Sequence, residues 1–248
     1  MFYYSNFLNL TRRSLVVATV FFAAGSVLAF QPVRYAPMDL YIQKPMPGGP
    51  KSVRVLDPEG AVLSSARFEY NGAGQLVAER FMNASGEATG QTRYVYEDQR
   101  IKEEQTIDAA GKLIGRTAFV YDRKDVLVRL EQFDAERRLV MSHNYRYKDG
   151  RIVEGVEVAG EAKDQFFLDY ADDRLVSVTV KNNEHGQLSR IVYRYDEAGR
   201  LKQRVRESFG NRSRCDYLYD AQGRIQAYAY YNEINGRWER EKKLQFEY

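Results

Sequence analysis

Residues 193–201, Tyr-Arg-Tyr-Asp-Glu-Ala-Gly-Arg-Leu, recur almost unchanged at residues 217–225, which read Tyr-Leu-Tyr-Asp-Ala-Gln-Gly-Arg-Ile. Alternating aromatic residues are typical of a half-buried strand. Asp at the start of a type I turn bonds its own backbone, and Gly three residues later takes the left-handed conformation that closes a hairpin. The polar and aliphatic pair that follows fixes the register of the returning strand. The phrase therefore predicts a strand, a tight turn and the start of the next strand.

Weaker copies of this phrase fill the chain from residue 51 to its end. The residues that match its second tyrosine are spaced by 23 to 29 residues, with a period near 25. They are Tyr70, Tyr96, Tyr121, Tyr147, Tyr170, Tyr195, Tyr219 and Tyr248. A period of this length held along most of a chain indicates a repeat architecture.

A second turn falls about halfway through each repeat, as at Asp108–Gly111 and Asn183–Gly186. The turns at Asp122–Asp125 and Asp134–Arg137 keep the acid and lack the glycine. Two strands per repeat give about sixteen short strands, and no stretch after residue 30 has sustained helical periodicity. We expect an all-β antiparallel meander that is strongly twisted, curled or spiral, with a tyrosine-rich interior.

The last strand shows the expected alternation most clearly. Trp238, Leu244, Phe246 and Tyr248 fall on one face under strict alternation, and the other face is wholly polar. This pattern predicts an antiparallel strand with one buried and one solvated side.

The first fifty residues differ in kind from the repeats. Residues 1–29 combine Arg12 and Arg13, a short apolar run and the small-residue exit Val27-Leu28-Ala29, the three parts of a secretory signal peptide. An uncleaved anchor is the alternative. Residues 30–50 contain five of the six prolines and predict an extended linker. The remaining residues, 51–248, form the repeat domain, and we expect a periplasmic or secreted bacterial protein.

Charge and cysteine content exclude several classes of function. Without residues 1–29 the net charge falls from +3 to +1, which gives no electrostatic basis for binding nucleic acid. The one cysteine, Cys215, excludes an internal disulfide and a cysteine-based zinc cluster. We expect no cofactor and no metal.

The phrase Tyr-x-Tyr-Asp-x-x-Gly-Arg-Leu resembles the YD repeats of bacterial RHS proteins and teneurins. The copies at 193–201 and 217–225 match in full or nearly so, and the resemblance covers about residues 60–248. It implies a curled or spiral β-sheet shell. RHS shells are several times longer and end in a variable toxic segment, so this chain looks like a small stand-alone YD-repeat protein.

Candidate site residues are few, and packing or turn-capping roles account for them. His143 and Cys215 share one position of the repeat with Thr117, Phe166 and Ile191, which predicts inward lining residues. His185 lies in a turn, and the turn acids Asp108, Asp196 and Asp220 are expected to cap turns rather than to bind calcium. The adjacent pairs Glu103-Glu104 and Asp172-Asp173 are expected to point to opposite faces. The densest aromatic cluster is Tyr228, Tyr230, Tyr231 and Trp238, beside Arg237.

No catalytic constellation emerges, so the first hypothesis is an exported, non-enzymatic scaffold that binds a protein or a glycan. The alternatives are a glycan-active enzyme that uses carboxylates, an outer-membrane barrel, and an accessory or immunity protein for a secreted toxin. The segment Ile101–Ile107 has no continuous apolar face for lipid, which disfavours the membrane barrel.

Overall fold

Sixteen antiparallel strands follow one another around a closed barrel in the computed structural model, which describes residues 49–97, 100–182 and 184–248. The strands are β1 (Ser52–Leu56), β2 (Val62–Tyr70), β3 (Leu76–Asn83), β4 (Ala88–Glu97), β5 (Arg100–Asp108), β6 (Leu113–Tyr121), β7 (Leu127–Asp134), β8 (Leu139–Lys148), β9 (Arg151–Ala159), β10 (Ala162–Ala171), β11 (Arg174–Asn182), β12 (Gly186–Tyr195), β13 (Leu201–Ser208), β14 (Asn211–Tyr219), β15 (Ile225–Ile234) and β16 (Arg237–Glu247). The expected all-β antiparallel meander of about sixteen strands is confirmed.

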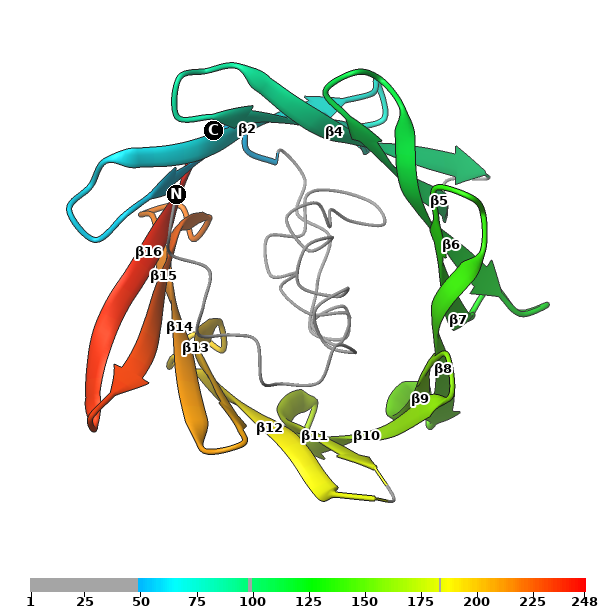
Figure 1. Ribbon diagram of the computed structural model, residues 1–248. Helices are drawn as coiled ribbons and strands as arrows, with labels where there is room; N and C mark the ends of the chain where they lie inside the picture. The colour runs from blue at the N-terminus through cyan, green and yellow to red at the C-terminus, as the bar shows by residue number, and fades with distance from the viewer. Residues whose placement is uncertain (1–48, 98–99, 183) are drawn as a thin grey trace.

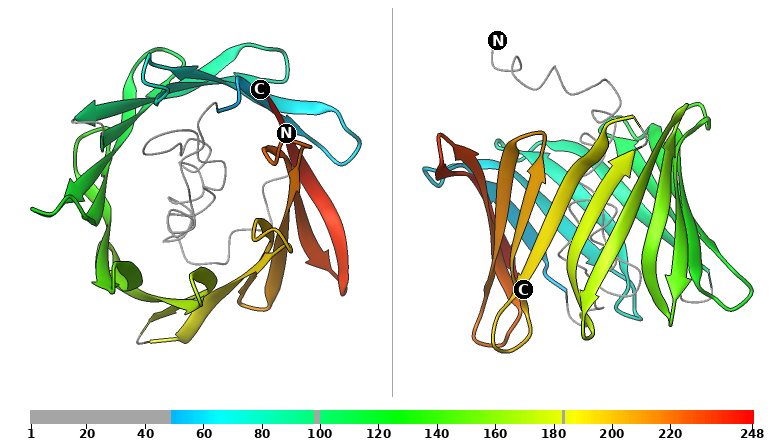
Figure 2. Two further views of the ribbon diagram at one scale, coloured as in Figure 1. Left: turned by 180° about the vertical axis from the view of Figure 1, so that it is seen from behind. Right: turned by 90° about the horizontal axis from the view of Figure 1, so that it is seen from below.

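Closure of the barrel depends on the pairing of the first and last strands. β1 pairs with β16 with Val53 opposite Phe246, and every other strand pairs with its neighbours in sequence. Figures 1 and 2 show the resulting ring, in which the blue β1–β2 region meets the red β16. Sixteen strands spaced about 4.8 Å apart and tilted by about 40° place opposite walls roughly 30 Å apart. The sequence left open whether the sheet closes or spirals, and the structure shows closure.

The turns have the predicted chemistry. Asp196 Oδ1 accepts a 2.7 Å hydrogen bond from the Arg200 amide, and Gly199 is left-handed with φ of 75°. Asp125 and Arg137 take the same conformation without being glycine, with φ of 62° and 64°. The turn geometry is therefore kept even where the favoured residue is missing.

A β-bulge precedes the repeat tyrosine in seven of the strands. In β14 the register shifts between Leu218 and Tyr219, so that Tyr219 lies opposite Ile225. Equivalent shifts precede Tyr70, Tyr96, Tyr121, Tyr147, Tyr170 and Tyr195. Each bulge turns the tyrosine and the first aliphatic residue of the next strand to the same face.

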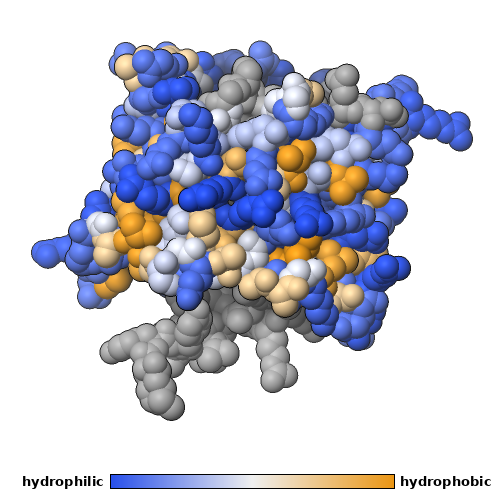
Figure 3. Space-filling view, turned by 90° about the horizontal axis from the view of Figure 1, so that it is seen from above, coloured by the Kyte–Doolittle hydropathy of each residue, from blue (hydrophilic) through white to orange (hydrophobic). Residues whose placement is uncertain are grey.

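The two faces of the wall differ in burial and polarity. Residues such as Tyr193 and Ile191 are 3% and 2% exposed, whereas their sequence neighbours Arg190 and Arg194 are exposed. Figure 3 shows that the side of the barrel wall seen in this view is mainly hydrophilic, with hydrophobic patches across its middle. We therefore call the buried face, with Tyr193 and its in-register partners, the inner face, and the other the outer face.

Two sequence predictions about side-chain direction are wrong. Tyr230 pairs with Lys242 and Tyr231 pairs with Arg240, which leaves Glu241 as an extra, bulged residue. Trp238 is thereby on the outer face, while Leu244 and Phe246 are on the inner face. The second error concerns Asp172 and Asp173, whose side chains were expected to point to opposite faces of a strand. Asp173 falls between β10 and β11, and Asp172 is left-handed with φ of 53°.

The predicted signal peptide, residues 1–29, and residues 30–48 of the predicted linker lie outside the described residues. The last linker residue, Pro50, is fully buried at the start of the described chain. Among the described residues, no helix is long and apolar enough to cross a membrane.

Candidate functional site

A belt of tyrosine hydroxyls joins alternate strand pairs at one end of the barrel. Tyr219 Oη donates a 2.7 Å hydrogen bond to the carbonyl oxygen of Leu201, which begins the neighbouring strand β13. The eight hydroxyl-to-carbonyl pairs are Tyr70 to Pro50, Tyr96 to Leu76, Tyr121 to Ile101, Tyr147 to Leu127, Tyr170 to Ile152, Tyr195 to Leu175, Tyr219 to Leu201 and Tyr248 to Ile225. Six of these bonds tie an even-numbered strand to the strand before it, at the end where no hairpin turn joins the two, and the other two involve Pro50, just before β1, and Tyr248, just after β16.

The arginine of the phrase reinforces this tyrosine belt. The Arg224 guanidinium lies 4.2 Å from the ring centre of Tyr248, and Arg200 lies 4.5 Å from that of Tyr219. Burial raises the pKa of Tyr121, Tyr147, Tyr219 and Tyr248 to about 12. The hydroxyls therefore remain protonated donors at physiological pH.

A histidine and a carboxylate meet on the inner face of β8 and β9. His143 Nε2 lies 2.7 Å from Glu157 Oε2, and the His143 side chain is 1% exposed. The Phe166 ring centre lies 6.3 Å from that of His143 and 6.0 Å from that of Tyr145. The prediction that His143 lines the interior is confirmed. Its carboxylate partner was not predicted, because cross-strand register decides the pairing.

The inner face carries acidic side chains on β5 and β9 and basic side chains on β13. Glu104 on β5 and Glu157 on β9 pair in register with inner residues. Arg204 and Arg206 on β13 pair with the buried Tyr193 and Ile191, and β5 and β13 are half a turn apart in the sixteen-strand ring.

These arginines were missed by strict alternation. The bulge opposite Tyr195 places Leu201 and Arg204, three residues apart, on the same face. A period of two from Leu201 would have put Gln203 and Val205 inside. The bulge that recurs before the repeat tyrosine is the feature from which the inward direction of these arginines could have been predicted.

The aromatic cluster predicted from sequence is split by the wall. Tyr228 is 1% exposed on the inner face, with its ring centre 5.0 Å from that of Tyr217. Tyr231 and Trp238 are outside, where Arg214 lies 4.2 Å and 5.0 Å from their ring centres. The cluster, with Arg237 at the start of β16, is therefore not one site.

The other candidate residues fall where structural roles predict. Cys215 is buried on the inner face, and His185 lies in an exposed turn. Asp108 and Asp220 each accept amide hydrogen bonds from the residues two and four positions later. Glu104 is inside and Glu103 outside, as expected. In the three described ranges, no three His, Cys, Asp or Glu side chains gather in a group that could hold a metal ion.

Comparisons with known proteins concern the fold. No protein-family model matches the chain, and no curated protein matches it. The crystal structure of a porin-like protein from Bacteroides uniformis is similar with a TM-score of 0.51 and 12% identity, over 79% of this chain and 95% of that one. A porin-like protein from Bacteroides vulgatus gives a TM-score of 0.36 at 11% identity, over 80% and 98% of the two chains. TcdB2-TccC3 without its hypervariable C-terminal region gives 0.29 at 13%, over 76% of this chain and 15% of that one. The first of these similarities shows a shared barrel fold.

Proposed function

We propose that this chain is an exported, non-enzymatic barrel that works in water and binds a ligand within its lumen. One observation carries the proposal: the buried aromatic and aliphatic side chains, such as Tyr193 and Ile191, lie on the inner face, while exposed charged side chains such as Arg67, Arg93 and Arg190 lie on the outer face. Large repeat proteins and wide barrels both use concave surfaces for binding. The repeated roles of Tyr, Asp, Gly and Arg support a YD-type repeat, in which the conspicuous residues build the wall.

The outer face is poorly suited to lipid. Six cationic residues lie near the middle of outer strand faces, and they are Arg67, Arg93, Arg116, Arg190, Arg214 and Lys243. A cationic residue at the bilayer midplane of a membrane barrel costs about 2–4 kcal/mol. Arg116 and Arg214 have acidic partners within 3.2 Å, which lowers their share of this cost. The remaining cost still favours water outside the barrel.

The test uses matched phenylalanines on the two faces. Phe81 packs against the inner core, and Phe167 lies on the outer face beside Lys181. The protein is purified without detergent from the periplasm or culture fluid of its host and is weighed by native mass spectrometry. We expect the native protein to carry a bound species that is absent from the denatured protein. The amount of this species should fall in Phe81→Ser and stay unchanged in Phe167→Ser. The absence of any bound species, or equal depletion in both variants, would contradict lumenal binding.

An outer-membrane barrel is the second candidate, and a specific observation favours it. The strands close at sixteen, and the fold is shared with a porin-like protein. Within the described ranges, eight large apolar side chains are also exposed, among them Leu63, Val95 and Leu218. Stepwise conductance in a planar lipid bilayer would support this candidate over the first, whereas a silent bilayer would count against it.

A further inference from the structure

Six of the eight exposed large apolar side chains in the described ranges lie at one end of the barrel. At this end, which we call the hairpin rim, turns join each odd-numbered strand to the even-numbered strand that follows, and the tyrosine belt lies at the opposite end. Single exposed apolar residues are ordinary on a soluble protein, but a set gathered on one rim marks a contact surface. The six, each in a turn or at an adjoining strand end, are Val62, Leu63, Ile114, Leu139, Phe209 and Ile234.

Phe209 is the least expected of these residues. It is 57% exposed, and it takes a left-handed conformation with φ of 49° in the two-residue turn Phe209-Gly210. In the turns Asp149-Gly150 and Asn235-Gly236 the same position has φ of 51° and 52° and holds Asp and Asn, which tolerate this conformation. A bulky apolar side chain does not. Neither turn geometry nor burial accounts for phenylalanine here, which leaves a contact outside the barrel as its role.

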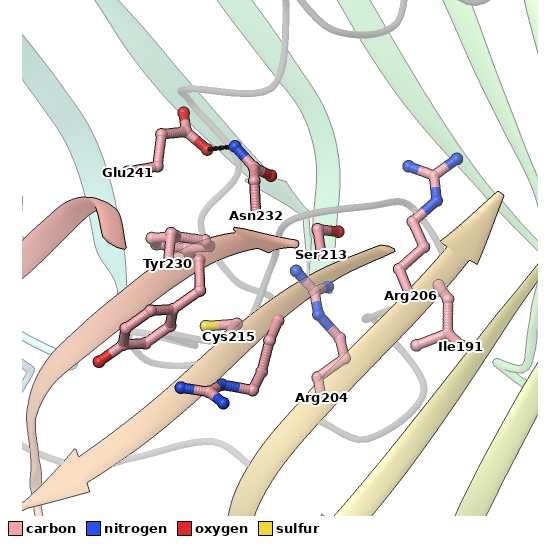
Figure 4. Close-up of a pocket in the computed structure, with 10 residues that line it drawn as sticks. Ile191, Arg204, Arg206, Ser213, Cys215, Tyr230, Asn232 and Glu241 are labelled. Atoms are coloured by element: carbon pink, nitrogen blue, oxygen red, sulfur yellow. Dashed lines mark hydrogen bonds between the residues drawn. The ribbon is translucent and has the colours of Figure 1, made fainter. Parts of the chain in front are cut away.

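The β15–β16 hairpin carries the only tryptophan of the chain behind its apolar tip. Ile234 is at the tip, and Trp238 lies on the outer face with the Arg212 guanidinium 5.4 Å from its ring centre. Figure 4 shows the 3.2 Å hydrogen bond that Asn232 donates to Glu241 across this hairpin, and Figure 1 shows β16, in red, leaning outward from the ring. A tryptophan close to an apolar tip and beside a cation is typical of a membrane–water interface, where one end of the ring is apolar and the other is wet.

The spacing of the apolar tips favours lipid over a rigid partner. Neighbouring hairpins at the rim are two strands apart, which is about 12 Å around a barrel of this tilt. Exposed charged residues of both signs lie in the turns between and beside the tips, among them Glu59, Glu87, Lys112 and Arg137. A second copy of the chain would leave gaps and unpaired charges between separate tips. A fluid bilayer surface closes around each tip, and its headgroups accommodate both signs of charge.

We infer that the hairpin rim docks on the surface of a lipid bilayer. Phe209, Leu139 and Ile234 enter the boundary between headgroups and acyl chains, to a depth of about 5–10 Å. The barrel does not cross the bilayer, so the charged outer wall and the tyrosine-belt end stay in water. Docking on lipid goes beyond binding within the lumen and does not depend on it.

The test floats the purified protein with phosphatidylcholine vesicles on a density gradient and follows the fluorescence of Trp238. Because the chain has one tryptophan, its emission reports on the β15–β16 hairpin alone. Phe209→Asn supplies the residue that its turn prefers, so this variant should fold at least as well as wild type. Leu139→Ser changes a second tip. Leu218→Ser is the matched control, because Leu218 is 44% exposed and lies beside the tyrosine belt at the opposite end.

We expect the wild-type protein to float with the vesicles, its tryptophan emission to shift to shorter wavelength, and carbonate to release it. Phe209→Asn should weaken vesicle binding about fivefold or more, since part of the transfer free energy of an aromatic side chain is lost. Leu139→Ser should weaken binding by a similar factor, and Leu218→Ser should stay within about twofold of wild type.

Three results would overturn docking on lipid: no binding to vesicles, unchanged binding in both Phe209→Asn and Leu139→Ser, or an equal loss in Leu218→Ser. Retention on vesicles after carbonate would replace docking by a barrel that spans the bilayer. A dimer in sedimentation velocity that dissociates in Phe209→Asn, with no vesicle binding, would assign the rim to a second copy of the chain.

Discussion

Tyr219 Oη donates its hydrogen bond to the carbonyl oxygen of Leu201, a residue of the preceding copy of the phrase. The aromatic ring of Tyr219 also contacts Arg200, which precedes Leu201. The Arg-Leu pair that ends one copy of the phrase thus contacts the second tyrosine of the next copy. The residues of the repeated phrase therefore stabilise the contact between neighbouring repeats as well as each hairpin.

Removal of a single hydroxyl from the tyrosine belt is predicted to lower stability without unfolding the barrel. Tyr147→Phe and Tyr219→Phe each remove one hydroxyl and leave a carbonyl without its donor, so each should lower the free energy of unfolding by about 1 kcal/mol. Denaturant unfolding followed by circular dichroism measures this loss. Tyr231→Phe, on the outer face, is the control and should change stability little. Equal effects at Tyr219 and Tyr231 would contradict the belt.

The same tyrosines predict alkaline unfolding. Burial raises the pKa of Tyr147 and Tyr219 from 10.0 to about 12, so the folded state holds these protons more tightly than the unfolded state does. Their contribution to stability is complete below pH 10 and is lost as pH rises toward about 12. A pH titration of unfolding free energy should show this decline, shallower in Tyr147→Phe. A flat profile over this range would contradict buried, protonated hydroxyls.

The sequence predicted the strands, turns and number of repeats because Tyr, Asp and Gly act locally. The remaining features of the fold depend on pairing between residues that are far apart in the chain. The barrel closes through Val53 against Phe246, which no local pattern specifies. The direction of Trp238 depends on the bulge at Glu241, and the partner of His143 depends on the register of β8 with β9. The inward direction of Arg204 and Arg206 was missed for the same reason.

A larger residue in place of Gly155 is predicted to cause a severe packing defect. A Cβ at this position would lie 2.2 Å from Phe166 Cζ and 2.4 Å from the Asn144 carbonyl oxygen, and the latter is backbone that cannot rotate away. Gly155→Ala should therefore cost about 3 kcal/mol of unfolding free energy. Gly115→Ala is the matched control, because its nearest atom would lie at 3.5 Å. Comparable thermal midpoints for the two variants would contradict this close approach.

Replacement of Arg137 by glycine is predicted to stabilise the protein. It takes a left-handed conformation with φ of 64° at the turn position where the repeat prefers glycine. Arg137→Gly relieves that strain and should raise the free energy of unfolding by about 0.5–1 kcal/mol, after the greater unfolded-state freedom of glycine is allowed for. Ala135→Gly, in the same turn, should lower stability or leave it unchanged. A loss of stability in Arg137→Gly would be contrary to the proposed strain.

The most direct test of the account is where the protein is found after cells that express the full chain are broken and washed with carbonate and high salt without detergent. Charged residues such as Arg67, Arg93 and Arg190 on the outer face predict that the protein remains in the aqueous supernatant after ultracentrifugation, as a folded β-protein by circular dichroism. Recovery only in the membrane pellet, with release by detergent alone, would contradict a water-facing outer wall and favour a membrane barrel.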